Sequence, residues 1–124
     1  VIQADGGTRT AAINGGFIAM VQALRFWQKR GNISAFPVKD YLGAVSAGIV
    51  EGNALLDLTY EEDHMAAVDM NVVMSGSGAF IEIQATGEEA SFSEEELNKL
   101  LGLAKGGISE IIRIEKEILG ELKI

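Results

Sequence analysis

The sequence predicts a single α+β domain over residues 1–124, with helices packed on one face of a β-sheet. The length of 124 residues is typical of one domain and is enough for one sizeable core. Segments with strand-like and helix-like patterns follow the order strand, helix, several strands, helices. The apolar residues of the helical segments recur with helical spacing. Both helix groups are therefore expected to cover the same side of the sheet, in a two-layer arrangement.

The chain is predicted to begin with a short strand and a long helix. Residues 1–5 (VIQAD) are largely apolar, as in a buried strand, and are followed by Gly6 and Gly7. Residues 10–30 are predicted to form a helix because their apolar residues follow helical spacing. These residues are Ile13, Phe17, Met20, Val21, Leu24 and Trp27. Since the chain starts inside an apolar run and without Met, we expect it to be a fragment or a processed product.

Four strands are predicted in the middle of the chain. Residues 42–50 (LGAVSAGIV) are small and apolar on both faces, as in a central strand. The three-residue loop EGN then leads into a second strand over residues 54–58, which makes a hairpin. Residues 68–74 and 79–85 are two further strands, joined by the turn SGSG. Between the two strand pairs, residues 59–67 (TYEEDHMAA) are expected to form an acidic loop.

The last third of the chain is predicted to be helical. Ser93 and Glu96 are spaced as in a capping box, which marks the start of a helix. The pair Gly106 and Gly107 is expected to break the segment into two helices, because each glycine costs about 1 kcal/mol relative to alanine. The buried residues of the first helix are predicted to be Leu97, Leu100, Leu101 and Ala104. Those of the second helix are predicted to be Ile108, Ile111, Ile112, Ile118 and Leu122.

Composition limits the kinds of function that fit this chain. The net charge of −8 argues against general coating of nucleic acid, which needs clustered Lys and Arg. Without cysteine, disulfides and thiolate–metal sites are excluded, which is compatible with a reducing cytosol. No apolar run approaches the ~20 residues of a membrane span, so no membrane contact is expected.

The segment from Gly6 to Thr10 is the first candidate site. Unpaired N–H groups at a helix start suit a phosphate, and Arg9 would add a bidentate donor. An arginine in the first helical turn is unfavourable unless an anion neutralises it. The alternative is an ordinary glycine turn, with Thr8 as the helix cap and Arg9 paired to a local carboxylate such as Asp5. The segment matches neither a Walker A loop nor a G-x-G-x-x-G turn.

The acidic segment before the third of these strands is the second candidate site. Asp69 lies inside an otherwise apolar run, where a carboxylate is costly to bury unless it is paired or binds a cation. Together, Asp63 and Asp69 could hold Mg²⁺, or one of them could keep a proton as a general acid. The alternative is a solvated acidic loop with one Asp that caps or pairs locally. His64, beside Asp63, is more simply interpreted as an exposed loop residue than as a catalytic one.

Several blocks of the sequence together resemble the C-terminal half of the bacterial ribonuclease PH family. They are QADGGTRTAAI, VSAGIV, YEEDHMAAVDMNVVM and the helix FSEEELNKLLGLA. The blocks occur in order from Val1 to about Leu122, and the pairing of GGTRTA with EED-x5-DMNVVM is specific to the family. The resemblance implies the two-layer ribonuclease PH-like sandwich, also found in domain 2 of ribosomal protein S5. It implies a mixed sheet with helices on one face.

The resemblance also implies an activity and assigns residues to it. The family trims the 3′ ends of tRNA precursors as a phosphorolytic 3′–5′ exoribonuclease, a phosphate-dependent nucleotidyltransferase. Inorganic phosphate is the co-substrate and nucleoside diphosphates are released. By motif, Gly7, Thr8 and Arg9 match the phosphate-binding residues. Asp63 and Asp69 match the essential acidic pair, expected to bind a divalent ion such as Mg²⁺ or to manage the proton on the leaving 3′-hydroxyl.

The N-terminal half of the family is absent from this chain. In the family that half supplies further arginines for phosphate and RNA, so the site in this chain alone is expected to be incomplete. The resemblance implies a cytoplasmic protein that assembles as a hexameric ring of dimers. The alternative is a non-catalytic RNA-binding or scaffolding subunit of an exosome-like ring. In such subunits the acidic pair or the phosphate arginine is typically lost, whereas both are present here.

Overall fold

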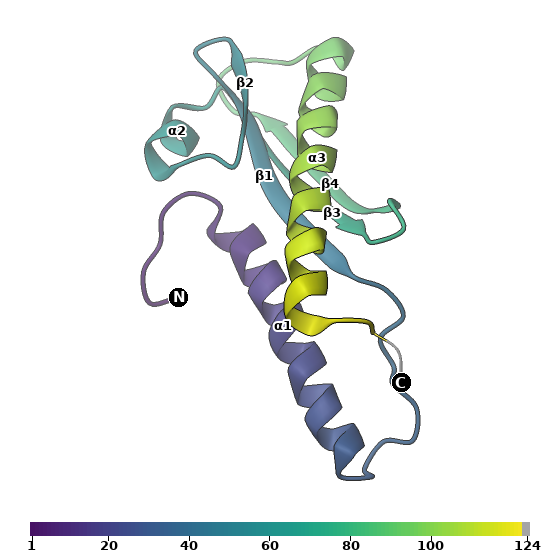
Figure 1. Cartoon of the computed structure of the whole chain (residues 1–124). Helices are drawn as coiled ribbons and strands as arrows, with labels where there is room; N and C mark the ends of the chain where they lie inside the picture. The colour runs from purple at the N-terminus through teal and green to yellow at the C-terminus, as the bar shows by residue number, and fades with distance from the viewer. Residues whose placement is uncertain (123–124) are drawn as a thin grey trace.

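The computed structural model describes residues 1–122, which contain three helices and four strands (Figure 1). The α+β class is confirmed. In chain order the elements are α1 (Thr8–Lys29), β1 (Leu42–Val50), β2 (Asn53–Leu56), α2 (Tyr60–Met65), β3 (Val68–Ser75), β4 (Phe80–Gly87) and α3 (Glu94–Leu119). Within residues 1–122, none of the helices has the length and apolarity needed to cross a bilayer.

The four strands form one sheet in the order β2-β1-β3-β4. Each neighbouring pair of these strands is antiparallel, so the described sheet is antiparallel rather than mixed as the resemblance implied. Strand β1 lies inside the sheet and β3 beside it, in agreement with their apolar sequences. The hairpin between β1 and β2 turns through Glu51 and Gly52 alone, because Val50 pairs directly with Asn53. The predicted three-residue loop is therefore one residue too long.

The two faces of β1 contact different parts of the molecule. Val45, Ala47 and Ile49 point toward α3 and belong to the main core, together with the apolar residues of β3 on the same face. Because side chains alternate along a strand, Ser46 and Gly48 lie on the opposite face. There Gly48 approaches Leu58 and Ala66, which flank α2.

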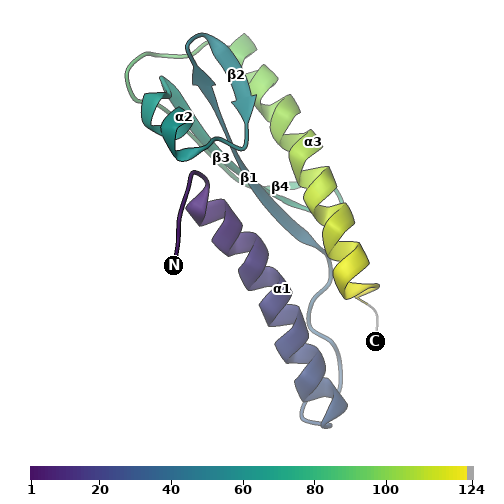
Figure 2. The same cartoon turned by 60° about the vertical axis from the view of Figure 1, so that its left-hand side comes forward.

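The prediction that the helices share one face of the sheet is wrong. Only α3 covers the main-core face, whereas Ala66, at the end of α2, packs with Val50 and Leu58 on the opposite face. Helix α1 lies along the edge of β1, where the side chain of Asn14 both donates to and accepts from the backbone of Ala44. In both views α1 begins just below α2 (Figures 1 and 2). Helical spacing predicts an apolar stripe but not which surface the stripe meets.

Helix α1 buries less of its apolar stripe than predicted. Phe17 and Val21 are buried in a second cluster with Phe36 and Leu119, the last residue of α3. In contrast, Met20 and Trp27 are about half exposed, and so is Phe26 (46, 54 and 54%, respectively). The helix therefore contacts the rest of this chain along a narrow band and leaves an apolar surface uncovered.

Helix α3 is continuous, so the predicted break at Gly106 and Gly107 is wrong. The cost of two glycines in a helix is about 2 kcal/mol. It is offset by burial of a stripe that runs along the whole helix and packs on β1, β2 and β3. The buried apolar members are Leu100, Ala104, Ile108, Ile112 and Leu119. Ser93 caps the start of the helix by accepting from the Glu96 N–H.

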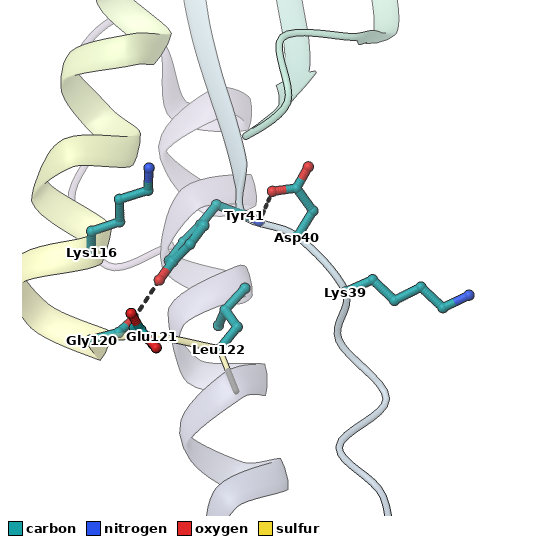
Figure 3. Close-up of a pocket in the computed structure, with 7 residues that line it drawn as sticks. All are labelled: Lys39, Asp40, Tyr41, Lys116, Gly120, Glu121 and Leu122. Atoms are coloured by element: carbon teal, nitrogen blue, oxygen red, sulfur yellow. Dashed lines mark hydrogen bonds between the residues drawn. The ribbon is translucent and has the colours of Figure 1, made fainter. Parts of the chain in front are cut away.

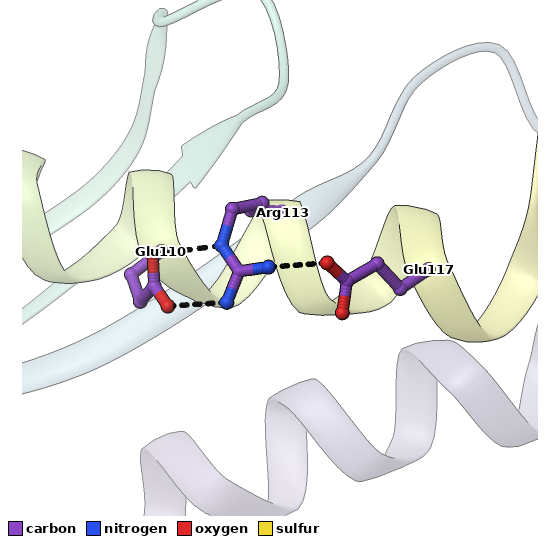
Figure 4. Close-up of polar contacts among 3 residues, drawn as sticks. All are labelled: Glu110, Arg113 and Glu117. Atoms are coloured by element: carbon purple, nitrogen blue, oxygen red, sulfur yellow. Dashed lines mark hydrogen bonds and ion pairs between the residues drawn. The ribbon is translucent and has the colours of Figure 1, made fainter.

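The exposed side of α3 contains a small ion-pair network (Figure 4). Arg113 pairs with Glu110 one turn before it and with Glu117 one turn after it. These three side chains are more than half exposed. On the buried side, Glu115 is only 1% exposed, and neither carboxylate oxygen has a hydrogen-bond partner among residues 1–122.

Two further predicted elements differ from the structure. Residues 1–5 form no strand, because they pair with no strand of the described chain, and Val1 and Ile2 are fully exposed. Residues 60–65, predicted to be loop, form the short helix α2. A capping box marks the start of this helix. The Thr59 side chain accepts from the Glu62 N–H, and the Glu62 side chain accepts from the Thr59 N–H.

The start of α1 approaches the segment between β2 and α2 at Gly6. A Cβ atom at Gly6 would lie 2.0 Å from the carbonyl oxygen of Leu58 and 2.6 Å from the carbonyl carbon of Thr59. Since both neighbours are backbone atoms, they have no rotamer by which to move away. Glycine at this position therefore fixes how closely α1 approaches α2.

We predict that Gly6→Ala lowers the free energy of unfolding by about 1–3 kcal/mol, the cost of forcing an extra carbon into a packed contact. Gly15→Ala is the matched control, because no atom outside its helix lies within 4 Å of a Cβ at that position. This control should gain about 1 kcal/mol from helix propensity. Urea unfolding measures both values. Equal effects of the two substitutions would contradict the close contact at Gly6.

We also predict that Glu115 makes stability depend on pH. Burial raises the pKa of Glu115 from 4.5 to about 7, an effect that the nearby Leu42 backbone partly offsets. Because the folded state favours the protonated form of Glu115, the contribution of this residue to stability is complete below pH 4.5. It is lost as the pH rises to about 7, by roughly 3 kcal/mol.

Glu115→Gln removes the charge while keeping the size of the side chain. Relative to the parent protein, its free energy of unfolding should rise between pH 4.5 and pH 8, as measured by urea titrations at each pH. Glu117→Gln, on the exposed side of the same helix, is the control and should show no such trend. Parallel pH profiles of the parent protein and the Glu115→Gln variant would show that Glu115 ionises normally.

Candidate functional site

Helix α1 begins without a side-chain cap. Its N-cap is Gly7, whose φ of 72° lies in the left-handed region that favours glycine. The first backbone bond of the helix joins the Ala11 N–H to the Gly7 carbonyl. The N–H groups before Ala11 in the helix therefore have no helical acceptor, and no acidic residue lies in the first turn. The helix presents the positive end of its dipole here.

The two threonines of this segment bond to nearby backbone. The Thr8 hydroxyl donates to the Asp5 carbonyl at 3.1 Å, and the Thr10 hydroxyl donates to the Gly7 carbonyl at 3.0 Å. The alternative in which Thr8 caps the helix is wrong, because the N-cap is Gly7 and Thr8 is the first helical residue. These bonds fix the shape of the turn and leave the N–H groups of the first helical turn available.

Arg9 extends across the sheet to β4. Its Nη2 atom lies 2.7 and 3.0 Å from the two carboxylate oxygens of Glu82. The suggested pairing with Asp5 is therefore wrong. Only Nη2 makes a hydrogen bond within the part of the chain that the structure describes, so Nε and Nη1 remain available for another acceptor. About half of the Arg9 side chain is exposed.

Asp5 links the start of α1 to α2. One of its carboxylate oxygens accepts hydrogen bonds from the Gly6 N–H and the Tyr60 N–H. These bonds lower the pKa of Asp5, with the Tyr60 bond as the larger cause. The carboxylate thus holds the first residue of α2 against the turn that precedes α1.

Asp63 and Asp69 come from different elements, α2 and β3, but act on one another electrostatically. Asp69 is half-buried, and its side chain lies on the face of the sheet away from α3. Burial raises the pKa of Asp69, and the negative charges of Asp63 and Glu88 raise it further. No ion pair to a basic side chain neutralises either aspartate among residues 1–122.

The two aspartates have the chemistry that a hard divalent cation needs. Mg²⁺ is usually held by one or two carboxylates together with water and substrate phosphates. The described residues bring no third acidic or histidine side chain into such a group. The unneutralised pair therefore fits an ion that is completed by a bound phosphate, and it does not fit a closed structural metal site.

All five predicted site residues line one cleft of about 380 Å³. The structure thus brings Gly7, Thr8 and Arg9 together with Asp63 and Asp69, as expected from the motifs. What they bind stays a prediction. The other residues that line the cleft are Ala4, Asp5, Ser46, Tyr60 and Asn71. The sequence reasoning missed Ser46 and Asn71, although a polar residue in a strand that is otherwise apolar is a signal that could have found them.

His64 and a larger cavity lie outside this cleft. His64 is exposed and stacks on Tyr60, with the ring centroids 6.1 Å apart. The larger cavity, of about 530 Å³, lies between the end of α3 and the segment before β1 (Figure 3). There the Tyr41 hydroxyl donates to the Gly120 carbonyl. This larger cavity is lined by Lys39, Asp40, Tyr41, Lys116, Gly120, Glu121 and Leu122, none of which is a predicted site residue.

Comparison with known proteins shows the family of the chain. Residues 40–107, more than half of the chain, match the 3′ exoribonuclease family, domain 2. The chain belongs to the 3′ exoribonuclease family. Asp63 and Asp69 lie inside the matched range, whereas Gly7, Thr8 and Arg9 precede it.

Relatives within the 3′ exoribonuclease family cover nearly the whole chain. It is 60% identical to ribonuclease PH of Listeria welshimeri and 59% identical to ribonuclease PH of Bacillus subtilis, in both cases over 98% of its length. The chain spans about half the length of these relatives and corresponds to their C-terminal half. A crystal structure of rice (Oryza sativa) Rrp46 shares the fold, with a TM-score of 0.77 and 23% identity. That match covers 98% of this chain and 52% of the rice chain.

We predict that Glu82 competes with an anion for Arg9. In Glu82→Gln the guanidinium no longer shares its charge with a carboxylate, so inorganic phosphate should bind roughly threefold more tightly. Calorimetric titration of the intact protein with phosphate measures this change. Glu110→Gln, which removes the same charge from the exposed side of α3, is the control and should leave phosphate affinity unchanged. Weaker binding in Glu82→Gln would show instead that Glu82 holds Arg9 in place.

Proposed function

We propose that the intact protein containing this chain is a phosphorolytic 3′–5′ exoribonuclease that trims the 3′ ends of tRNA precursors. The observation that supports this most directly is the shared cleft. It combines the uncapped start of α1 and Arg9 with the acidic pair Asp63 and Asp69. Membership of the 3′ exoribonuclease family agrees with this proposal.

The start of α1 is suited to hold the attacking phosphate. Backbone N–H groups and the helix dipole favour an anion at this position. Arg9 adds a guanidinium with Nε and Nη1 available, which matches the geometry of phosphate oxygens. Gly7, in its left-handed conformation, lets the backbone turn toward the ligand without a side chain in the way.

The reaction transfers a nucleotidyl group from RNA to phosphate. A phosphate oxygen forms a bond to the phosphorus of the last phosphodiester, and the bond from that phosphorus to the preceding 3′ oxygen breaks. The terminal nucleotide leaves as a nucleoside diphosphate. The proton carried by hydrogen phosphate ends on the 3′ oxygen of the shortened RNA, so the step is balanced in protons and charge.

We assign Asp63 and Asp69 to the RNA side of the reaction. In this proposal they hold a divalent cation, Mg²⁺, which when bound neutralises the charge that develops on the phosphoryl oxygens and the leaving oxygen. Burial raises the pKa of Asp69, and the negative charges of Asp63 and Glu88 raise it further. A bound cation would relieve the repulsion between the two carboxylates. Asp69 is fixed by β3, whereas Asp63 is fixed by α2, so the pair is preorganised by the fold.

The intact protein is proposed to act in the cytoplasm with further protein surfaces around this domain. Met20, Phe26 and Trp27 of α1 and Ile81 and Ile83 of β4 are exposed apolar side chains. Exposed apolar side chains can be buried by contact with another protein surface. We propose that the remaining half of the protein and further copies, in a hexameric ring of dimers, cover these surfaces. The RNA 3′ end would enter the cleft between them.

The decisive experiment incubates the intact protein with a tRNA that has a 3′ extension, with and without inorganic phosphate. Nucleoside diphosphates should form, and only when phosphate is present. Release of monophosphates, or shortening without phosphate, would contradict phosphorolysis. Binding of RNA without any shortening would instead support the non-catalytic, scaffolding subunit.

Two substitutions should distinguish the role of the phosphate-binding residues from the role of the acidic pair. Arg9→Ala should raise the KM for phosphate about 10- to 100-fold, because a charged hydrogen-bond donor to the ligand is lost. Asp69→Asn should lower kcat by a factor of about 100 or more while RNA still binds. Steady-state kinetics and RNA binding assays measure these effects.

The control for these variants is Arg113→Ala. Arg113 is likewise an exposed arginine paired to glutamate, but it lies on α3, on the other side of the sheet. Replacement of Arg113 should change neither the KM for phosphate nor kcat. Near-normal turnover in Asp69→Asn would remove Asp69 from the reaction.

A further inference from the structure

We propose that Ser46 is a further phosphate ligand in the cleft, donating its hydroxyl hydrogen to the oxyanion held at the start of α1. This inference rests on the proposed function and gives a role to a residue of the block VSAGIV to which the resemblance assigned none. Ser46 lies in the middle of β1, and its side chain points to the face of the sheet away from α3.

The Ser46 hydroxyl is buried and has no hydrogen-bond partner among the described residues. The residue is 4% exposed, and its Oγ atom makes no hydrogen bond within residues 1–122. A buried hydroxyl without a partner costs about 1–3 kcal/mol. In native proteins such groups are rare, and each calls for an explanation. A ligand that completes the hydrogen bond is one explanation, provided that the hydroxyl points toward a binding site.

Ser46 does lie at a binding site, directly against the turn that starts α1. It lines the cleft with Arg9 and Asp69, and a Cβ at Gly7 would be 3.4 Å from its Oγ atom. The Oγ atom is therefore next to the uncapped end of the helix, where an anion is expected. Its backbone is also fixed, because the Ser46 carbonyl accepts from the Asp57 N–H at 2.8 Å.

A neighbouring hydroxyl provides a comparison. Thr10 is buried to a similar degree, and its Oγ1 atom would also lie 3.4 Å from a Cβ at Gly7. However, Thr10 already donates to the Gly7 carbonyl. Thr10 is thus a structural hydroxyl, whereas the Ser46 hydroxyl finds no acceptor in the part of the chain that the structure describes.

A hydroxyl at this position would add specificity as well as affinity. Arg9 approaches from the exposed side of the cleft, whereas Ser46 lies at its buried floor in β1. An oxyanion between them would be bound from two directions, together with the N–H groups of the helix. This arrangement would hold one phosphate oxygen away from the RNA and leave another free to attack.

The test compares Ser46→Ala with the parent in the intact protein, using inorganic phosphate as the probe. The KM for phosphate should rise roughly tenfold, since a hydrogen bond to a charged ligand is lost. The dissociation constant for phosphate, measured by calorimetry, should rise by the same factor. The kcat at saturating phosphate and the affinity for RNA should stay within about twofold. Ser46→Cys keeps the size of the side chain with a weak donor, so its KM should lie between the two.

Ser109→Ala is the matched control, because Ser109 is an exposed serine of α3 whose hydroxyl donates to the Lys105 carbonyl. It should leave all four constants unchanged. An unchanged phosphate KM in Ser46→Ala overturns the inference, as does a loss of kcat at normal KM. If Ser46→Ala does not fold, a normal phosphate KM in Ser46→Cys overturns it equally. Failure of the proposed function differs: the parent protein itself then neither consumes nor binds phosphate, and both proposals fall together.

Discussion

The contact between Gly6 and the backbone of Leu58 and Thr59 sets the geometry on which the cleft depends. Helix α1 contributes the positive end of a dipole and Arg9, whereas α2 and β3 contribute negative charge. These elements are separate in sequence, and only a residue without a side chain allows their backbones to meet. Asp5 reinforces the same junction by accepting from N–H groups on both sides of it. The cleft is therefore built at a junction of backbones, with the functional side chains arranged around it.

The charges in the cleft are balanced over a short distance within a chain that is strongly acidic overall. A net charge of −8 repels a polyanion at long range. In our proposal, attraction comes from groups close to the ligand, namely the helix start, Arg9 and the Ser46 hydroxyl. Glu82 moderates the Arg9 charge in the free protein, and an anion would take over that role on binding. Asp63 and Asp69 likewise repel each other in the free protein, and a cation would relieve this repulsion.

Sequence reasoning succeeded where local pattern decides the structure. Strand β1 was predicted with its observed bounds, because a run of small apolar residues between turns has few alternatives. Sequence reasoning failed where contacts between residues far apart in the sequence decide the structure. The burial of α3 overrides two glycines, and the placement of α1 and α2 on different surfaces leaves no trace in helical spacing. The capping box around α2 was a local signal that was overlooked.

The candidate site shows the same division. Motifs predicted Gly7, Thr8, Arg9, Asp63 and Asp69, and the structure places them in one cleft. Ser46 could not be ranked from sequence, because a serine in a buried strand usually bonds to backbone. Only the absence of such a bond in the described structure sets it apart. Residue type predicts chemistry, but the lack of a partner can be seen only in three dimensions.

The paired hydrogen bonds between Asn14 and Ala44 have a consequence for how the sheet avoids pairing with other chains. The carboxamide offers one donor and one acceptor to β1, just as the peptide group of another strand would. Beyond the short strand β2, the edge of β1 would otherwise expose backbone groups to which a foreign chain could add. A single side chain of α1 occupies that position. The helix that begins at the cleft therefore also protects this part of the sheet from strand addition and aggregation.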